Sequence, residues 1–313
     1  MSISHIIVKK ILTDEEISNN EGNYYDEKHF KYIITADTDV YKEDGELLLK
    51  FRKNVIPKEL TDNALSSYKK VAKIKKNNRG AAAGVLDLAK LPKYVQQIYN
   101  DSNNKKKNKY SSHYITKNGE KSKTVTTNLA ASNIIGYYDK PDRNINKDGK
   151  APKCRQTAFT RDNQLLWNKT LPFIEHIDKL FKELIPDKHL LQYKQAQKTP
   201  KFVINDTCFS TLTVNYSWRT AVHKDSGDFK EGFGNLIVIE DIENPNIYQG
   251  SYTGFPQYGV CVDLRTGDFL AMDVHEWHCN TEFKSDNKKI NDNFNRLSIV
   301  CYLRNKMIQC KDL

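Results

Sequence analysis

A His-x-Asp triplet followed by a distant histidine is the pattern in this chain that could hold a metal ion. His223 and Asp225 end a β-rich run. In a strand, the side chains at positions i and i+2 point the same way, so both could meet one ion. His278, far downstream, could supply a third ligand. Two histidines and one carboxylate leave coordination positions open, as non-haem Fe(II) oxygenases require. Taken alone, a His-x-Asp triplet is more often a surface pair near a turn.

Two histidines compete for the distal position. In an extended strand, His275 and His278 would face opposite sides. We prefer His278, because it follows a strand by a short turn and precedes Cys279 and Asn280, which are small and polar. His275 would then be a packing residue or lie at the rim of the pocket.

An arginine opens the last apolar run of the chain, RLSIVCYL. A buried Arg296 suits the distal carboxylate of 2-oxoglutarate, because guanidinium and carboxylate pair in a two-pronged fork. Ser298 should share the face of Arg296 and could add a hydrogen bond. The alternative is that Arg296 pairs with an Asp or Glu across the barrel. Asn215 and Arg219 flank the metal-binding segment and could contact 2-oxoglutarate or a substrate.

The second half of the chain has the pattern of an antiparallel sandwich or barrel. Turn residues separate short apolar runs, which predict strands: KFVIND, CFSTLTVNYS, NLIVIED, YGVCVDL, DFLAMDV and RLSIVCYL. Before them, the apolar spacing over residues 170–185 predicts a supporting helix, with Thr170 as its N-cap and Pro186 and Asp187 at its end.

The first half is more irregular. Residues 31–56 predict a hairpin that turns at Gly45, and Pro57 opens a predicted helix. The segment NNRGAAAG at residues 77–84 indicates either a backbone that passes close to another part of the molecule or a mobile loop. Residues 100–123 are polar and basic, and predict a surface loop or disordered insertion that could touch a phosphate backbone.

A second polar linker, at residues 140–150, suggests how the chain is organised. We expect residues 1–150 to form an N-terminal α/β extension packed on the core. Residues 151–313 then form the core itself. The predicted class is therefore α+β, with a mixed first half, a supporting helix and a C-terminal β-barrel.

Composition limits the class of protein. Of the 313 residues, 38% are hydrophobic and 11% aromatic, which supports a packed core. No apolar run approaches the roughly 18 residues of a membrane span, and no signal-peptide pattern is present. We expect a soluble intracellular protein, cytoplasmic or nuclear. The net charge of +10 suits a nucleic acid, although a Lys- and Asn-rich composition alone would also produce it. Oligomeric state is not predicted.

The six cysteines are scattered, and none forms a Cys-x-x-Cys pair. This spacing predicts neither a disulfide framework nor a cysteine-bound zinc site, and we expect most of them to be buried thiols. They are Cys154, Cys208, Cys261, Cys279, Cys301 and Cys310.

Over residues 150–307 the chain resembles the base-J-binding-protein/TET branch of the 2-oxoglutarate oxygenases, especially its viral and phage-type members. The similar segments are FSTLTVNYSWRTAVHKDSGD, GFGNLIVIED, QGSYTGFPQYGVCVDLRTGDFLAMDVHEWHCNTEF and RLSIVCYLRNKM. In that pattern the metal ligands fall on His223, Asp225 and His278, and the 2-oxoglutarate arginine falls on Arg296. The chain departs from the family at Gln249-Gly250, where two glycines are common. It also lacks a discrete DNA-reading domain and the zinc-binding cysteine region of the animal enzymes.

The resemblance implies a double-stranded β-helix core of the jelly-roll or cupin type. It also implies Fe(II), 2-oxoglutarate and O2 as cofactor and cosubstrates, and hydroxylation of the 5-methyl group of thymine or 5-methylcytosine in nucleic acid, with DNA favoured. The alternatives are the same chemistry on a protein side chain or small molecule, and a non-catalytic nucleic-acid-binding module. Candidate substrate-binding residues are Arg219, Arg155, Thr157 and Trp277.

A base in duplex DNA must leave the stack to reach a buried metal, and aromatic side chains could then stack on it. For each aromatic near the motifs, core packing is the commoner role. The candidates are Tyr216, Trp218, Phe233, Tyr252, Phe255 and Trp277.

Overall fold

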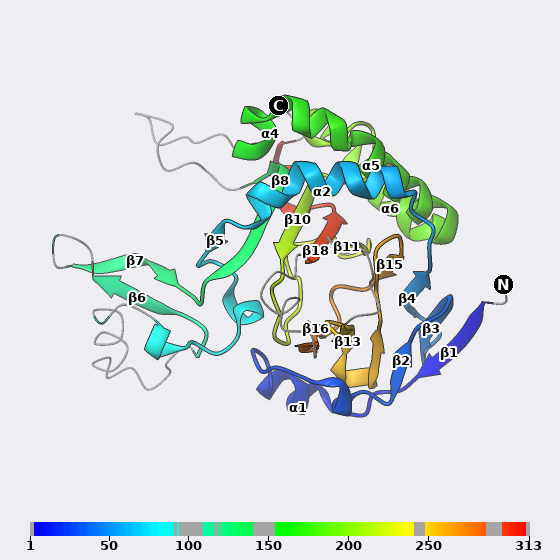
Figure 1. Cartoon of the computed structure of the whole chain (residues 1–313), viewed down its shortest axis with the longest axis horizontal. Coiled ribbons are helices and arrows are strands. Elements are labelled where there is room, and N and C mark those ends of the chain that lie inside the picture. The colour runs from blue at the N-terminus through cyan, green and yellow to red at the C-terminus, as the bar shows by residue number, and fades with distance from the viewer. Residues whose placement is uncertain are drawn as a thin grey trace.

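Strands from both halves of the chain form one large sheet at the centre of the molecule (Figure 1). The structure is a computed structural model, and it describes residues 3–90, 93, 109–115, 118, 120–139, 154–240, 248–285 and 296–310. In spatial order the sheet contains β1 (Ser4–Val8), β3 (Thr38–Lys42), β4 (Leu47–Arg52), β15 (Phe269–Met272), β11 (Gly234–Glu240), β18 (Arg296–Tyr302), β10 (Thr211–Tyr216), β8 (Ala130–Tyr138) and β5 (Lys75–Lys76). A short strand, β9 (Arg155–Gln156), pairs with β8 off this path.

A smaller sheet packs on the inner side of the large one. It runs in the order β16 (Cys279–Asn280), β13 (Thr253–Phe255), β14 (Val260–Val262) and β2 (Tyr32–Ile34), and β12 (Gln249–Gly250) pairs with β17 (Phe283–Lys284) beside it. Leu236 and Leu270 of the large sheet share an apolar cluster with Val260 and Val262 of the small one. The predicted α+β class with a double-stranded β-helix core is confirmed.

Strand β18 shows how the large sheet separates a structural face from a functional one. Leu297, Ile299 and Cys301 are fully buried in an apolar cluster with the helices. Ser298 and Val300 point to the opposite face and line a cavity inside the barrel. This alternation follows from the two-residue period of a strand, and it places polar groups where a ligand can reach them.

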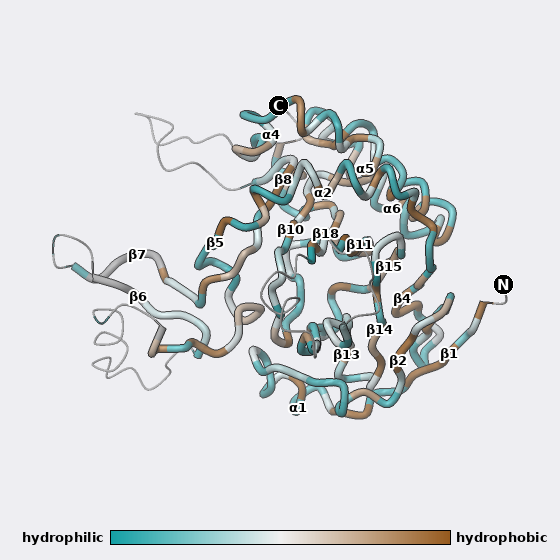
Figure 2. Tube along the Cα trace, viewed as in Figure 1, coloured by the Kyte–Doolittle hydropathy of each residue, from teal (hydrophilic) through white to brown (hydrophobic). Residues whose placement is uncertain are grey.

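Helices cover the outer face of the large sheet (Figure 1). The described helices on this side are α2 (Lys58–Ala72), α4 (Ala158–Asp162), α5 (Gln164–Leu184) and α6 (Pro186–Ala196), whereas α1 (Asp14–Asn19) lies on the opposite side of the molecule, near the small sheet. Phe173, Ile177 and Phe181 form a fully buried stripe of α5 against the sheet, while the outer turns of α5 and α6 are largely hydrophilic (Figure 2). None of these helices is long and apolar enough to cross a membrane.

Helix α5 begins earlier than predicted. It starts at Gln164, so the prediction of Thr170 as N-cap is wrong. The hydroxyl of Thr170 lies inside the helix, where it donates to the carbonyl of Trp167 at 2.7 Å and accepts from the Tyr68 hydroxyl at 2.7 Å. This buried pair satisfies a polar side chain that would otherwise favour a helix end. Pro186 does follow the helix, but it starts α6.

Two further predictions from polar and apolar patterning need correction. Within the stretch predicted as a loop or insertion, β6 (Ser112–Ile115) and β7 (Lys121–Thr126) pair as an antiparallel hairpin that projects from the barrel (Figure 1). Residues 100–108, 116, 117 and 119 of that stretch lie outside the described residues. KFVIND forms no strand, because a 3-10 turn, Pro200–Phe202, is followed by positive φ angles at Asn205 and Asp206.

The first half is built into the barrel. The predicted hairpin is shorter than expected: β3 and β4 pair around a turn with Gly45 at φ 83°, while β2 joins the small sheet. The helix predicted after Pro57 is α2. Strands β3, β4 and β8 all belong to the large sheet. The division near residue 150 stays a prediction, since residues 140–153 lie outside the described residues.

The cysteine prediction is wrong for one pair. Cys154 and Cys310 form a disulfide with a Cα–Cα distance of 6.1 Å, which is within the usual range. A separation of 156 residues gives no local signal for such a pair, because the fold alone brings β9 beside the C-terminal turn. The other four, Cys208, Cys261, Cys279 and Cys301, are buried free thiols, as expected.

Candidate metal centre

The structure brings His223, Asp225 and His278 together. Nε2 of His223 lies 3.7 Å from Oδ1 of Asp225, and Nε2 of His278 lies 3.6 Å from Oδ2 of the same carboxylate. The three candidate ligand atoms all lie within 4.8 Å of one another. Three such groups around one point can hold a divalent metal ion on one side and leave its other side open.

Backbone pairing sets this geometry. His223 and His278 form an isolated antiparallel bridge, in which each N–H donates to the other residue's carbonyl at 3.0 Å. The N–H of Asp225 donates to the carbonyl of Val274 at 3.0 Å. His223 thus lies beyond the end of β10 and outside any longer strand. His278, which follows β15 by a short turn, lies in this cluster with His223 and Asp225.

Both imidazoles are held in the form that a metal ligand needs. Nδ1 of His223 lies 2.8 Å from the carbonyl of Ala221, and Nδ1 of His278 lies 2.9 Å from that of Glu276. A carbonyl only accepts hydrogen bonds, so each Nδ1 carries a hydrogen, and Nε2, which faces Asp225, is the nitrogen of each ring that could bind a metal ion. His275 lies outside this cluster, with its Nε2 3.4 Å from the carbonyl of Phe229.

The cluster's electrostatics favour an ionised carboxylate. Burial and the neighbouring His278 lower the pKa of His223 to about 4. Burial also disfavours the charged ring of His278, but the hydrogen bond to Asp225, the negative charge of that carboxylate and the carbonyl of Glu276 together outweigh burial and raise the pKa of His278. Burial acts against the charge of Asp225, yet the two histidines hold its pKa well below the usual range. One carboxylate facing two Nε2 atoms is a strong site for a positive charge.

A cavity of about 110 Å³ opens beside the cluster. Asn215 and Ser298 line it, and Nδ2 of Asn215 donates to Oγ of Ser298 at 3.3 Å. On its other side, Oδ1 of Asn215 accepts a hydrogen bond from the hydroxyl of Ser132. Trp218 also lines the cavity, which makes it the aromatic among the proposed stacking residues that reaches this space.

Arg296 lies in an adjoining cavity of about 190 Å³, which shares Trp218 and Asn280 with the first. Its side chain is buried and donates from Nη2 to the carbonyl of Ser251 at 3.2 Å. Its buried Nε has no hydrogen-bond partner among the described residues. A buried donor without a partner is unfavourable, so this guanidinium is suited to a bound carboxylate.

The alternative partner for Arg296 is already engaged. Glu240 lies opposite Arg296 in the sheet register. Its carboxylate instead accepts hydrogen bonds from Tyr248 and Thr266, and it lies 3.6 Å from Nη1 of Arg265. Among the described residues, Arg296 makes no ion pair across the barrel. The arrangement favours a ligand role over a structural one.

Of the candidate substrate-binding residues, one lines the cavity of Arg296 beside the metal centre and others pack elsewhere. Arg219 lines the Arg296 cavity, but its guanidinium already donates to Asp26 at 2.5 Å. Trp277 packs in a separate apolar cluster, under the ammonium of Lys224. Arg155 stacks on the ring of Tyr138, with 4.5 Å from Cζ to the ring centroid.

Thr157 has a structural role. It is the N-cap of α4, accepting from the N–H of Thr160 at 3.4 Å, and it also borders a large cavity outside the barrel. The other aromatics proposed for stacking lie in apolar clusters: Tyr216, Phe233, Tyr252 and Phe255.

Sequence reasoning missed Arg79, which lines the metal-cluster cavity. For the segment that contains Arg79, the sequence indicated either a backbone that passes close to another part of the molecule or a mobile loop, and the structure shows the close approach. The carbonyl of Ala82 accepts from the N–H of Ala221 at 3.0 Å, two residues before His223. A single basic residue in an otherwise small and uncharged segment was the available signal.

The chain is similar to known proteins over its second half. Residues 133–305 match the Tet_JBP family, described as the oxygenase domain of the 2OGFeDO superfamily, and this range is more than half of the chain. This chain belongs to that family. Thymine dioxygenase JBP1 of Trypanosoma brucei brucei is 35% identical to it over 173 residues, which are 55% of this chain and 19% of JBP1.

A second Tet_JBP relative, the bifunctional helicase and thymine dioxygenase JBP2 of Leishmania tarentolae, is 37% identical over 174 residues, 55% of this chain and 14% of JBP2. This chain thus matches less than a fifth of the length of either relative. The solved structure of NgTET1 in complex with 5mC DNA aligns with a TM-score of 0.52 and 13% identity, covering 96% of this chain and 83% of that one. This likeness shows a shared fold.

The residues present fit the metal and cosubstrate that the Tet_JBP family name implies. Two neutral imidazoles and an ionised carboxylate are the donor set of a non-haem Fe(II) site. The orphaned guanidinium of Arg296 adjoins it, as a dicarboxylate spanning from the metal would require.

Proposed function

We propose that this protein is an Fe(II)- and 2-oxoglutarate-dependent dioxygenase that hydroxylates the 5-methyl group of thymine or 5-methylcytosine in nucleic acid, with DNA favoured. The observation that carries the proposal is the convergence of His223, Asp225 and His278 beside an orphaned buried arginine. The family supports the reaction type. Two relatives named as thymine dioxygenases support a pyrimidine methyl group as the target.

The residues have distinct roles in this proposal. His223, Asp225 and His278 hold the iron, and Arg296 pairs with the distal carboxylate of 2-oxoglutarate. Ser298 lines the same cavity as the three metal-binding residues. When bound, the iron and 2-oxoglutarate activate O2 to attack a C–H bond, so the protein's task is to bind, orient and shield.

The cavity wall suits such a reaction. Leu236, Met272, Val274 and Val300 line the same cavity as the metal cluster and give it an apolar side. An apolar wall keeps bulk water from the reacting carbon. The presence of Asp225 also favours hydroxylation, because halogenases of this class usually lack that carboxylate and bind chloride in its place.

Mass spectrometry of nucleosides tests the proposal. The protein is incubated with Fe(II), 2-oxoglutarate, O2 and DNA containing thymine or 5-methylcytosine, and digested products are searched for the hydroxymethyl nucleosides. We expect a hydroxymethyl nucleoside from one of the two bases, thymine or 5-methylcytosine, and an equal amount of succinate. The Asp225→Ala variant is the negative control. If succinate forms but no modified nucleoside is found in DNA or RNA, the substrate is a protein or a metabolite. If neither succinate nor a modified nucleoside forms, the oxygenase assignment is wrong.

A further inference from the structure

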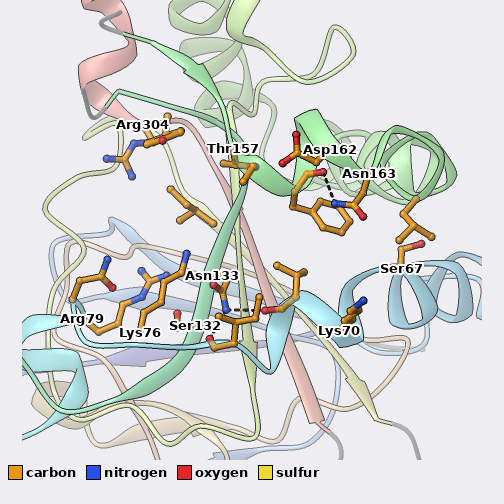
Figure 3. A pocket seen from close by; sticks show the side chains of 18 residues that line it. Ser67, Lys70, Lys76, Arg79, Ser132, Asn133, Thr157, Asp162, Asn163 and Arg304 are labelled. Atoms are coloured by element: carbon orange, nitrogen blue, oxygen red, sulfur yellow. Dashed lines mark hydrogen bonds between the residues drawn. The ribbon is translucent and has the colours of Figure 1, made fainter. Parts of the chain in front are cut away.

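A larger cavity lies outside the barrel and shares one lining residue, Arg79, with the metal-cluster cavity. It has a volume of about 580 Å³ and lies between α2, β5, β8 and α4 (Figure 3). Its size is in the range of a small-molecule site. One part of its wall is apolar, with Val71, Ile74, Ile134, Phe159 and Leu166. Another part is cationic, and that part carries the inference.

Lys76 and Arg79 lie near each other on one side of this cavity (Figure 3). Neither side chain forms an ion pair with any described residue, and the buried Nε of Arg79 has no hydrogen-bond partner among them. Burial lowers the pKa of both groups, and the charge of Arg79 lowers that of Lys76 further. Two partly buried like charges that form no ion pair with a described residue destabilise each other, so the pair is suited to a bound anion.

Two of the other charged groups of the cavity, Arg304 and Asp162, are already paired, and Lys70 adds a further cation on its α2 side (Figure 3). Arg304 pairs with Asp139 at 2.5 Å. Asp162, the acidic residue among the described lining residues, pairs with Arg161 at 2.7 Å. The cavity therefore carries a net positive charge, and Arg79 places part of that charge beside the metal-cluster cavity, which it also lines.

Arg79 also connects this cavity to the metal centre. It lines both cavities, and its charge acts on Asp225 and His223. The Arg296 cavity, in contrast, meets the metal centre through Trp218 and Asn280 and shares no lining residue with the large cavity. The two cationic sites thus adjoin the metal centre through different walls. This separation assigns Arg296 and Arg79 to different anions.

We propose that Lys76 and Arg79 bind a backbone phosphate of the nucleic-acid strand whose base enters the His223–Asp225–His278 cavity. The outer cavity then holds the adjacent nucleotide of that strand against its apolar wall. This inference rests on the proposed function, because it requires a nucleic-acid substrate. It adds the position at which the strand's backbone is held.

Charge removal on both partners tests the proposal. Lys76→Gln and Arg79→Gln are compared with Lys75→Gln, which removes the same charge from an exposed neighbour on β5 that does not line the cavity. Affinity for a thymine-containing oligonucleotide is measured by fluorescence anisotropy across a salt series. We expect Lys76→Gln and Arg79→Gln each to weaken binding by about tenfold and to reduce the salt slope by about one. Lys75→Gln should match the wild type.

Oligonucleotides with single neutral methylphosphonates beside the target base complete the test. One such position should weaken binding to the wild-type protein by about tenfold, and the same position should cause no further loss in Arg79→Gln. Arg79→Lys, which keeps the charge, should keep the salt slope. Anaerobic titration with 2-oxoglutarate is run on the same variants, and circular dichroism checks their fold.

The outcomes separate the inference from the function beneath it. If the wild type modifies the oligonucleotide but Lys76→Gln and Arg79→Gln bind it like Lys75→Gln, the phosphate site is wrong and the proposed function stands. If Arg79→Gln instead weakens 2-oxoglutarate binding and leaves the salt slope unchanged, Arg79 anchors the cosubstrate and the inference is overturned. If the wild type neither binds nor modifies any oligonucleotide, both proposals fail together.

Discussion

Two clusters in the described part of the chain combine histidine with acidic or thiol groups, yet they differ in what they can bind. One is His223, Asp225 and His278 inside the barrel. The other is Asp178, His189 and Cys208, where α5, α6 and the segment before β10 meet. In both, the candidate ligand atoms lie within 4.8 Å of one another.

The second cluster is satisfied by its own neighbours. Oδ1 of Asp178 lies 3.1 Å from Nε2 of His189 and accepts from the backbone N–H of Cys208 at 2.8 Å. Gln192 donates to Sγ of Cys208 at 3.4 Å. Burial raises the pKa of this thiol well above its ordinary value, so it stays protonated and is a poor ligand.

The barrel cluster is arranged the opposite way. Its imidazoles direct their Nδ1 hydrogens to carbonyls and keep both Nε2 atoms for Asp225, which borders a cavity. Proximity of ligand-type residues therefore does not define a metal site. Free lone pairs and an adjoining space do, and this distinction can be tested.

The largest expected effect is loss of metal binding in the barrel cluster. His223→Ala, Asp225→Ala and His278→Ala should each reduce iron-dependent succinate formation by at least about 100-fold, because even outer partners of metal ligands account for 10–100-fold. Anaerobic Fe(II) titration should show the binding loss directly, with a circular dichroism spectrum like the wild type. Retained stoichiometric binding in all three variants would remove the metal assignment.

The next effect concerns the cosubstrate. Arg296→Lys should weaken 2-oxoglutarate binding by roughly tenfold to a hundredfold, since an ammonium cannot reproduce the two-pronged pairing. The measurement is titration of 2-oxoglutarate into the anaerobic iron form. Fe(II) affinity in the absence of 2-oxoglutarate serves as the control and should not change. An unaltered 2-oxoglutarate affinity would return Arg296 to a structural role.

A smaller effect, of a different kind, is expected in the satisfied cluster. His189→Ala removes the buried partner of the Asp178 carboxylate and should lower the free energy of unfolding by about 1–3 kcal/mol. Urea denaturation measures this change. Stoichiometric Fe(II) binding and turnover at low temperature should remain, because the barrel cluster is untouched. Loss of iron together with His189 would show that the two clusters are not independent.

Features of the fold and the candidate site could be predicted from the sequence where residues close together in the chain determine them. The helix α2 and the final strand β18 follow from local periodicity, and both were predicted. The N-cap at Thr170 was not, because a hydroxyl partner from Tyr68, far along the chain, keeps that residue inside α5.

Long-range contacts decided the remaining failures. The disulfide between Cys154 and Cys310 depends on the fold bringing two distant segments together. The position of Arg79 beside the metal cluster likewise depends on Ala82 pairing with Ala221. The convergence of His223 and Asp225 with a distant His278 was predictable only because the chemistry of the metal specifies which residue types must meet.

The smallest expected effect tests which distal histidine belongs to the cluster. His275 is three residues from His278 and has the same chemistry, but its Nε2 faces the carbonyl of Phe229 at 3.4 Å and its backbone N–H donates to Asp273 at 3.0 Å. The side-chain contact is long, and the backbone bond survives truncation. His275→Ala should therefore change unfolding free energy by less than about 1 kcal/mol and leave Fe(II) affinity and succinate formation near wild-type values. His278→Ala is its matched control, since the same side chain is removed from the same turn. If His275→Ala abolishes iron binding while His278→Ala retains it, the two histidines exchange roles, and the backbone bridge between His223 and His278 would be structural only.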